Sequence, residues 1–148
     1  MKKTNKGFSL VELIIVIAIM AILAGALAPA LIKYINKSRL SSDVSNGQQI
    51  ASAIQEALTN EDVYDGITSN VYSGDVSGMD ATLYGEVKKI LGDDFAKAKA
   101  KKASDGDSLD QTYQVEINVT SNVVKVYGTS IDSAHMLYPT PGAKFIVK

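Results

Sequence analysis

One apolar run dominates the N-terminal part of the chain. From Leu13 to Ile32 there is no charged residue, and most side chains are aliphatic. A helix of about 20 apolar residues spans the ~30 Å hydrocarbon core of a bilayer. The segment before the run, Met1 to Gly7, is short, polar and positive, and a flank of this kind stays on the cytoplasmic side. The pattern predicts a helix that can cross a membrane and direct the rest of the chain outward.

Beyond Pro29 the apolar pattern becomes one-sided. Apolar or small residues recur in steps of three or four and form one stripe: Val44, Gly47, Ala51, Ile54 and Leu58. Polar residues mostly occupy other faces: Lys37, Arg39, Asp43, Gln48, Gln49 and Glu56. Such a pattern is typical of an amphipathic helix. One helix of roughly 75 Å is therefore predicted from Ser9 to about Thr59, with Asn60 as its terminator.

After the long helix, the sequence predicts a loop and a second helix before the first strand. Residues 61–82 are rich in Asp, Gly, Ser and Asn, which indicates a connecting loop with short irregular structure. Helical spacing returns at Leu83 and Val87, so a second helix is expected over about Ala81 to Leu91. The segment from Lys97 to Ala103 is a candidate extension of that helix.

Alternation of apolar and polar residues then predicts a small sheet. Residues from Tyr113 to Val119 form one expected strand, a turn follows at 120–122, and Val123 to Tyr127 form the return strand. A third strand is expected from Lys144 to Lys148. A small antiparallel sheet packed on the amphipathic half of the long helix would bury both apolar faces, so the predicted fold class is α+β.

Two ordinary interpretations of the apolar run leave Glu12 unexplained. A plain transmembrane anchor accounts for the length and the basic flank, yet a carboxylate costs about 2.5–3.5 kcal/mol near the centre of a membrane helix and less at its edge. A secretory signal would be cut at Ala26-Leu27-Ala28, but Pro29 makes that site a poor one. The run is also longer than the ~7–15 residues of such signals.

A third interpretation comes from the residues around the start of the run, which form one motif: Lys6-Gly7-Phe8-Ser9-Leu10-Val11-Glu12-Leu13. This motif resembles the leader junction of type IV pilins and pseudopilins. The resemblance implies that prepilin peptidase cuts between Gly7 and Phe8, that the Phe8 amine is methylated, and that Glu12 is the family's buried glutamate. Pro29 matches the family's helix proline. The close resemblance covers roughly residues 6–39.

The resemblance also implies an organisation and a function. Residues 1–7 would be a cleaved leader, 8–32 a membrane and filament-core helix, and 33–148 an amphipathic helix with a pilin head. The chain would be a type IV pilus subunit used for adhesion, motility or DNA uptake. Its partners would be copies of itself, prepilin peptidase/methyltransferase, the assembly platform, minor pilins and, before assembly, the cytoplasmic membrane. The alternatives are a pseudopilin of a type II secretion-like machine and a membrane-anchored binding domain.

Three residues of the long helix have two interpretations each. In the family model Glu12 neutralises the freed amine of a neighbouring subunit; alternatively it is solvated by lipid headgroups. Gly25 and Pro29 both weaken a helix, since glycine lowers helix propensity and proline removes a hydrogen bond. Resemblance to assembled pilins suggests that this stretch partly unwinds in the filament, whereas a simple kink is the alternative.

Composition excludes several kinds of site. The chain has no cysteine, so disulfides, thiolate metal sites and cysteine nucleophiles are absent. It carries no phosphate-binding loop, serine nucleophile motif or paired histidines, and an enzyme or a cofactor is not expected. Without Lys2, Lys3 and Lys6, 12 of the 15 basic residues remain against 16 acidic ones, a side-chain charge of −4 that disfavours nucleic-acid binding.

Three local clusters have a functional and a simpler interpretation. Asp105, Asp107 and Asp110 could supply oxygen ligands to calcium, which some pseudopilins bind in the head, but a solvated turn before a strand is favoured. His135 has no partner set for catalysis and is expected at the surface or partly packed. Four lysines form a candidate polyanion patch that is better explained as a solvated helix end: Lys97, Lys99, Lys101 and Lys102.

Overall fold

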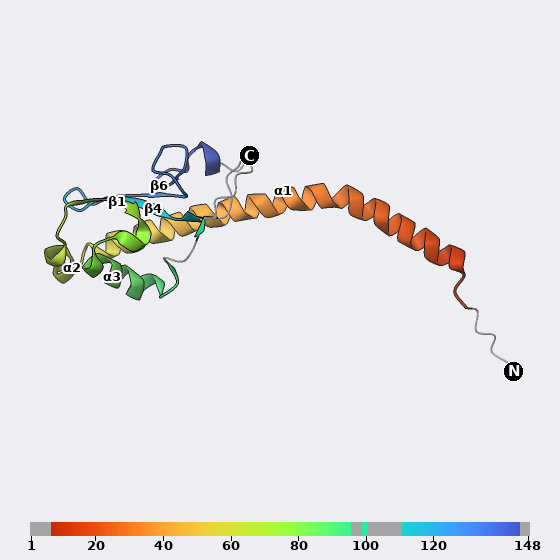
Figure 1. Cartoon of the computed structure of the whole chain (residues 1–148), viewed down its shortest axis with the longest axis horizontal. Coiled ribbons are helices and arrows are strands. Elements are labelled where there is room, and N and C mark those ends of the chain that lie inside the picture. Colours follow the sequence, from red (N-terminus) through yellow and green to blue (C-terminus); the bar gives the residue numbers. More distant parts are fainter. Residues whose placement is uncertain (1–6, 96–98, 101–110, 146–148) are drawn as a thin grey trace. The chain divides into compact units, whose positions relative to one another are not determined.

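The computed structural model describes residues 7–95, 99–100 and 111–145, without the side chains of 99, 100 and 111. The chain divides into two compact units, Met1–Ile35 and Asn36–Lys148. Helix α1 (Leu10–Ala57) runs through both, which confirms the predicted long helix to within two residues at each end (Figure 1). We describe the two units separately.

The first unit is the apolar half of α1. Every described side chain from Gly7 to Ile35 is at least partly exposed. Within the described residues, α1 is the one helix long and apolar enough to cross a membrane, and its most apolar window has no buried residue. The helix continues through Gly25 and Pro29 without interruption. The first unit therefore offers apolar surface that nothing in the described chain covers.

The second unit contains the core. The predicted stripe of α1 faces inward: Gly47, Ala51, Ile54 and Leu58 are buried and Val44 is half-buried. At Gly47 a Cβ atom would lie 2.6 Å from the Cβ atom of Leu137, so glycine is what permits this close approach. Asp43 corrects the sequence-based assignment: it was placed with the polar faces, yet its side chain is fully buried.

The sheet of the second unit has four antiparallel strands in the order β1-β4-β5-β6. The strands are β1 (Val71–Asp75), β4 (Gln114–Asn118), β5 (Val123–Tyr127) and β6 (Met136–Tyr138). Burial in β4 alternates as predicted, with Val115 and Ile117 buried. Figure 1 shows the yellow part of α1 alongside β1 and β4. The predicted hairpin is confirmed, and Asn122 takes φ 51° in its turn, a left-handed conformation that asparagine tolerates.

Short capped helices connect these elements. Helix α2 (Glu61–Gly66) begins after Asn60, whose side chain accepts a hydrogen bond from the Asp62 N–H. Helix α3 (Ala81–Leu91) has the predicted bounds and is capped by Asp80 in the same way. Gly92 ends α3 with φ 90°, a conformation that favours glycine. A two-stranded sheet pairs β2 (Lys99–Ala100) with β3 (Gln111–Thr112).

Three predictions about the second unit were wrong. Residues 61–82 contain α2, β1 and the 3-10 turn η1 (Val76–Gly78) instead of a loop. The extension of α3 is absent at residues 99–100, which form β2. A strand was expected from Lys144 to Lys148, but the strand that pairs with β5 is β6. Ala143–Phe145 form the 3-10 turn η3, and residues 146–148 lie outside the described chain. Strands β1, β2 and β6 each form by pairing with another strand, and local composition does not report such pairing.

Candidate processing and assembly site

The junction of the sequence motif lies in the non-helical segment before α1. A Cβ atom added to Gly7 would meet no atom within 4 Å. Phe8 is 83% exposed, and Ser9 is also exposed. Nothing in the described subunit therefore requires glycine at position 7, and the Gly7–Phe8 bond is open to another molecule.

Ser9 and Glu12 form a reciprocal cap at the start of α1. The Val11 N–H donates to the Ser9 hydroxyl oxygen at 3.3 Å, and the Ser9 N–H donates to Glu12 Oε2 at 2.8 Å. The Leu13 N–H donates to the Ser9 carbonyl at 3.2 Å, the first helical bond of α1. This is a capping box, in which serine and glutamate three residues apart satisfy N–H groups that the helix leaves unpaired.

The sequence carried a signal for this cap that our interpretation of the motif did not use. Ser9-Leu-Val-Glu12 matches the S-x-x-E pattern in front of an apolar run. Glu12 is thus held beside the N-terminus of α1, where the helix dipole favours negative charge. The Glu12 carboxylate accepts from the N–H of Ser9, the residue that directly follows Phe8.

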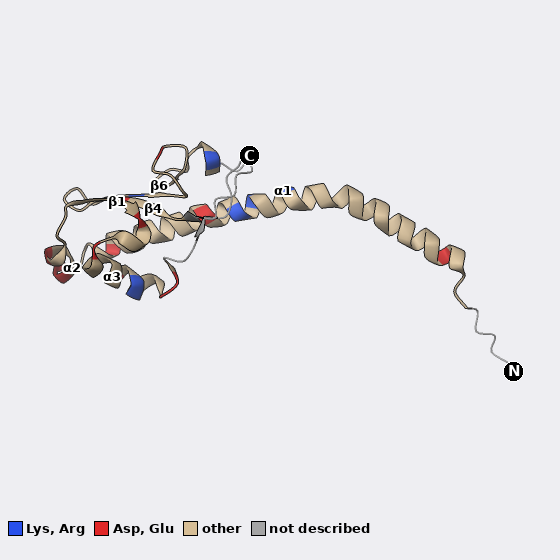
Figure 2. Ribbon diagram, viewed as in Figure 1, with Lys and Arg blue, Asp and Glu red and all other residues tan. Residues whose placement is uncertain are grey.

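Gly25 and Pro29 are the two residues between which the helix cannot form its usual backbone hydrogen bond. In an α-helix the N–H of residue 29 would bond to the carbonyl of residue 25, and proline has no N–H to donate. Added atoms at Gly25 would meet nothing within 4 Å. Both residues lie inside α1 in the uncharged stretch that Figure 2 shows in tan. The apolar half of α1 therefore lacks one backbone hydrogen bond at this place.

In the second unit, a buried polar network joins α1 to the sheet. The Tyr113 hydroxyl donates to Asp43 Oδ1 at 3.0 Å and accepts from Asn46 Nδ2 at 3.1 Å. Tyr113 and Asp43 are both fully buried. Burial raises the pKa of the Tyr113 hydroxyl far above its usual value, and the nearby Asp43 adds to the shift. The phenol therefore stays protonated and acts as a fixed donor.

Comparison with known proteins bears on both units. Residues 2–28 match the family model of the prokaryotic N-terminal methylation motif. Over 113 residues the chain is 35% identical to a type IV major fimbrial protein, FimA, of Dichelobacter nodosus. The aligned region covers 76% of this chain and 69% of the relative. A fimbrial protein of the same organism is 34% identical over 113 residues, with the same coverage. The chain belongs to the type IV pilin family. No solved structure matched it.

Membership of this family gives the pilin a structural role and not an enzymatic one. A further FimA protein of Dichelobacter nodosus is 43% identical over 58 residues, 39% of this chain and 37% of the relative. The long apolar helix and the small antiparallel sheet are the architecture that the leader motif implied. Gly7, Phe8 and Glu12 are placed together at the start of α1, whereas Gly25 and Pro29 lie farther along it.

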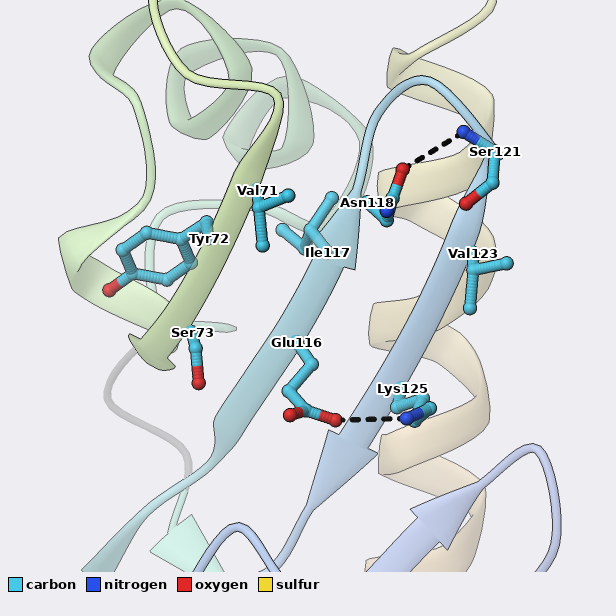
Figure 3. Close-up of a pocket in the computed structure, with 9 residues that line it drawn as sticks. All are labelled: Val71, Tyr72, Ser73, Glu116, Ile117, Asn118, Ser121, Val123 and Lys125. Atoms are coloured by element: carbon cyan, nitrogen blue, oxygen red, sulfur yellow. Dashed lines mark hydrogen bonds and ion pairs between the residues drawn. The ribbon is translucent and has the colours of Figure 1, made fainter.

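The pilin head carries a pocket of about 260 Å³ on the sheet face turned away from α1. Figure 3 shows α1 behind the strands, with Glu116 and Lys125 on the near side, where the Lys125 ammonium lies 3.1 Å from Glu116 Oε2. The Tyr127 hydroxyl also donates to Glu116, and this bond, followed by Lys125, lowers the pKa of the Glu116 carboxyl despite partial burial. Val71 and Val123 leave apolar surface at its rim. The acidic and basic groups there neutralise each other.

Other sequence candidates do not assemble into a site within the described residues. His135 Nδ1 lies 2.7 Å from Asp132 Oδ2, and the Asp132 carboxylate also accepts from the Ala134 and His135 backbone N–H groups, so the pair organises its own loop. No cluster of three metal-ligating side chains occurs in the part of the chain that the structure describes. The candidate calcium loop, 105–110, lies outside the described residues, as do Lys97, Lys101 and Lys102.

Proposed function

We propose that this pilin is made as a membrane-held precursor, cut after Gly7, methylated at Phe8 and polymerised through α1 into an extracellular type IV pilus. The observation that carries the proposal is the junction itself: an open Gly7–Phe8 bond, a capped helix start and an apolar helix with exposed side chains, in that order. Relatives named as major fimbrial proteins favour a pilus subunit over a pseudopilin.

Cleavage changes the charge beside Glu12. Hydrolysis of the Gly7–Phe8 amide leaves a carboxylate on Gly7 and an ammonium group on Phe8. The Glu12 carboxylate is already held near the new N-terminus, because it accepts a hydrogen bond from the N–H of Ser9, the residue after Phe8. A carboxylate in apolar surroundings is costly unless it is paired. Cleavage therefore supplies a positive charge that Glu12 of the same or a neighbouring subunit can neutralise when α1 enters the filament core.

The exposed apolar half of α1 needs cover in every stage. Large side chains along it are strongly exposed, among them Ile22 at 72% and Leu27 at 66%. Apolar patches of this extent mark membrane or protein contacts. Lipid covers the helix before assembly and neighbouring copies of α1 cover it afterwards. Prepilin peptidase/methyltransferase, the assembly platform and minor pilins are the partners that such a route requires.

The same route divides the chain into a leader of residues 1–7, a membrane and filament helix of residues 8–32, and a segment of residues 33–148 outside the membrane. The basic leader, with Lys2, Lys3 and Lys6, favours this orientation. Lys33, Lys37 and Arg39 also follow the apolar run, so a direct measurement of the orientation is needed. Protease added to the outer side of spheroplasts should digest the head and leave the leader intact. Digestion of the leader alone would refute the orientation.

Mass spectrometry of sheared surface material tests the whole proposal. The expected species starts at Phe8 and carries one added methyl group. A chain that retains Met1, or one that begins after Ala28, would contradict the proposed processing. Absence of the processed chain from the sheared fraction, with processed chain in the membrane, would support the pseudopilin alternative.

A further inference from the structure

We propose that Lys33 and Tyr34 form an anchor in the outer headgroup layer of the membrane, and that this anchor sets the depth at which the stored pilin keeps Glu12 at the inner edge of the hydrocarbon. The inference rests on the proposed membrane storage. It adds a lipid-binding surface and the position of the helix along the membrane normal.

The chemistry of the two residues suits that layer. Lys33 is the first charged residue after Glu12, and Tyr34 is the first aromatic residue after Phe8. Both side chains are exposed in the first unit, with Tyr34 at 71%. Tyrosine is enriched at membrane interfaces because its ring is apolar and its hydroxyl is polar. Lysine lays its apolar stem along the hydrocarbon and extends its ammonium group to lipid phosphates.

The length of the uncharged run fixes the other boundary. Leu13 to Ile32 is 20 residues, which in a helix span about 30 Å, the thickness of the hydrocarbon core. With Lys33 in the outer headgroups, the inner boundary falls between Glu12 and Leu13. A shift of one turn toward the cytoplasm would draw Lys33 into hydrocarbon, and a shift outward would draw Glu12 in. One depth therefore avoids both penalties.

Charge beyond the anchor supports the same partner. The next charged residues along the chain, Lys37 and Arg39, are also basic, and no acidic residue occurs between Glu12 and Asp43. Lysine and arginine directly beyond an apolar span extend their charged groups to the lipid phosphates of the adjacent headgroup layer. At this depth the Ser9–Glu12 cap and the Gly7–Phe8 bond lie in the inner headgroup layer, where a membrane peptidase can reach them.

The chain contains no tryptophan, so a single substitution gives one reporter of depth. Full-length Tyr34→Trp is placed in vesicles of phosphatidylethanolamine and phosphatidylglycerol whose acyl chains carry bromine either near the headgroup or near the chain end. We expect quenching mainly by shallow bromine. Two matched controls are Ile22→Trp in the middle of the run, quenched mainly by deep bromine, and Tyr64→Trp in the head, quenched by neither.

The controls separate the two proposals. If Ile22→Trp is unquenched, membrane storage itself fails. If Ile22→Trp is quenched but Tyr34→Trp behaves like Tyr64→Trp, the anchor is refuted and storage stands.

A second measurement tests whether the anchor sets depth. Leu13→Trp reports the inner boundary, and replacing both Lys33 and Tyr34 with alanine lengthens the uncharged run. The helix should then slide toward the cytoplasmic side, and the emission of Leu13→Trp should shift to longer wavelength with less quenching by deep bromine. Lys33→Arg should leave it unchanged. Unchanged emission in the double-alanine background would overturn the depth-setting role.

Discussion

The backbone N–H of Ser9 donates to Glu12 Oε2 at 2.8 Å, so the glutamate of the leader motif is part of the helix start even before any cleavage. Two roles thus meet in one side chain. The carboxylate caps α1, and in the proposed route its charge neutralises the freed Phe8 amine. Substitutions that remove one role and keep the other can separate them.

Glu12→Gln removes the charge and retains a capping side chain, because glutamine also serves in a capping box. We expect processing after Gly7, stable membrane-held protein and few or no filaments, since an unpaired buried ion would cost several kcal/mol per subunit. Co-expression with the wild-type chain should restore filaments in part. Electron microscopy and an immunoblot of the sheared fraction measure the yield, and normal yield with full processing would refute charge pairing.

Ser9→Ala is the matched control for the cap. It removes the hydroxyl that accepts from the Val11 N–H and leaves the Glu12 charge in place. Loss of a helix cap costs about 0.5–2 kcal/mol. Filament yield should therefore fall much less than in Glu12→Gln. Equal loss in both variants would mean that assembly depends on the Ser9 cap as strongly as on the Glu12 charge.

Gly7 offers a second test, in which folding and processing separate. Since a Cβ atom there meets nothing within 4 Å, Gly7→Leu should fold normally. We expect the peptidase to reject the added side chain, so that unprocessed protein accumulates in the membrane. Gly25→Ala is the control, because Gly25 has equal space within the described subunit. Intact-mass measurement of both variants shows whether each is cleaved. Normal cleavage of Gly7→Leu would mean that the peptidase does not require glycine at position 7.

The sequence predicted the elements whose signal is local. The apolar run, the stripe through Gly47 and Ile54, and the alternation of β4 all arise from periodicity, and the structure confirms them. Strand β1 was missed because its five residues, Val71–Asp75, include glycine, serine and aspartate, and its conformation depends on pairing with β4. Such pairing is a long-range property that composition does not report.

Asp43 was misplaced for a related reason. A carboxylate at that position is typical of a solvated face, whereas in the structure Asp43 is buried and accepts a hydrogen bond from the hydroxyl of Tyr113, seventy residues away. The capping role of Glu12 could have been predicted from S-x-x-E, but its role in pairing depends on a second molecule or on a new N-terminus. In the proposed route Gly7 and Phe8 likewise act through an enzyme, whose binding pocket belongs to another protein.

A fragment from Lys33 onward should be a soluble, folded monomer. It keeps the buried stripe of α1 and the four-stranded sheet, and it removes the apolar run that has no cover in the first unit. Circular dichroism should give mixed helix and strand signals with a cooperative melt, and size-exclusion chromatography should give a monomer. An unfolded or obligatorily aggregated fragment would show that the head needs the apolar half.

Within that fragment, Tyr113→Phe should destabilise the fold by about 1–3 kcal/mol, because a buried carboxylate loses a donor. In the wild-type structure the Asp43 carboxylate is fully buried. Tyr127→Phe is the matched control, since its hydroxyl serves Glu116 on the partly exposed sheet face. Urea denaturation measures both free energies of unfolding. If both variants lose the same free energy of unfolding, the burial of Asp43 does not determine how much Tyr113→Phe destabilises the fold.

Acid should destabilise the same fragment through its capping carboxylates. Hydrogen bonds from the Thr82 and Thr68 N–H groups, the first being the largest cause, lower the pKa of the Asp80 carboxyl below its ordinary value. A carboxyl group whose pKa is lower in the folded state contributes stability above its unfolded pKa, about 3.9 for aspartate, and loses it as the pH falls through the folded value. The melting temperature should therefore drop most steeply below about pH 4.

Asp80→Asn should keep α3 capped, because asparagine is an equally good N-cap, while removing this titration. The variant should melt close to the wild type near neutral pH and show a shallower fall in acid. A series of melting curves across this range measures both slopes, and identical slopes for the two proteins would show that Asp80 does not carry the acid sensitivity.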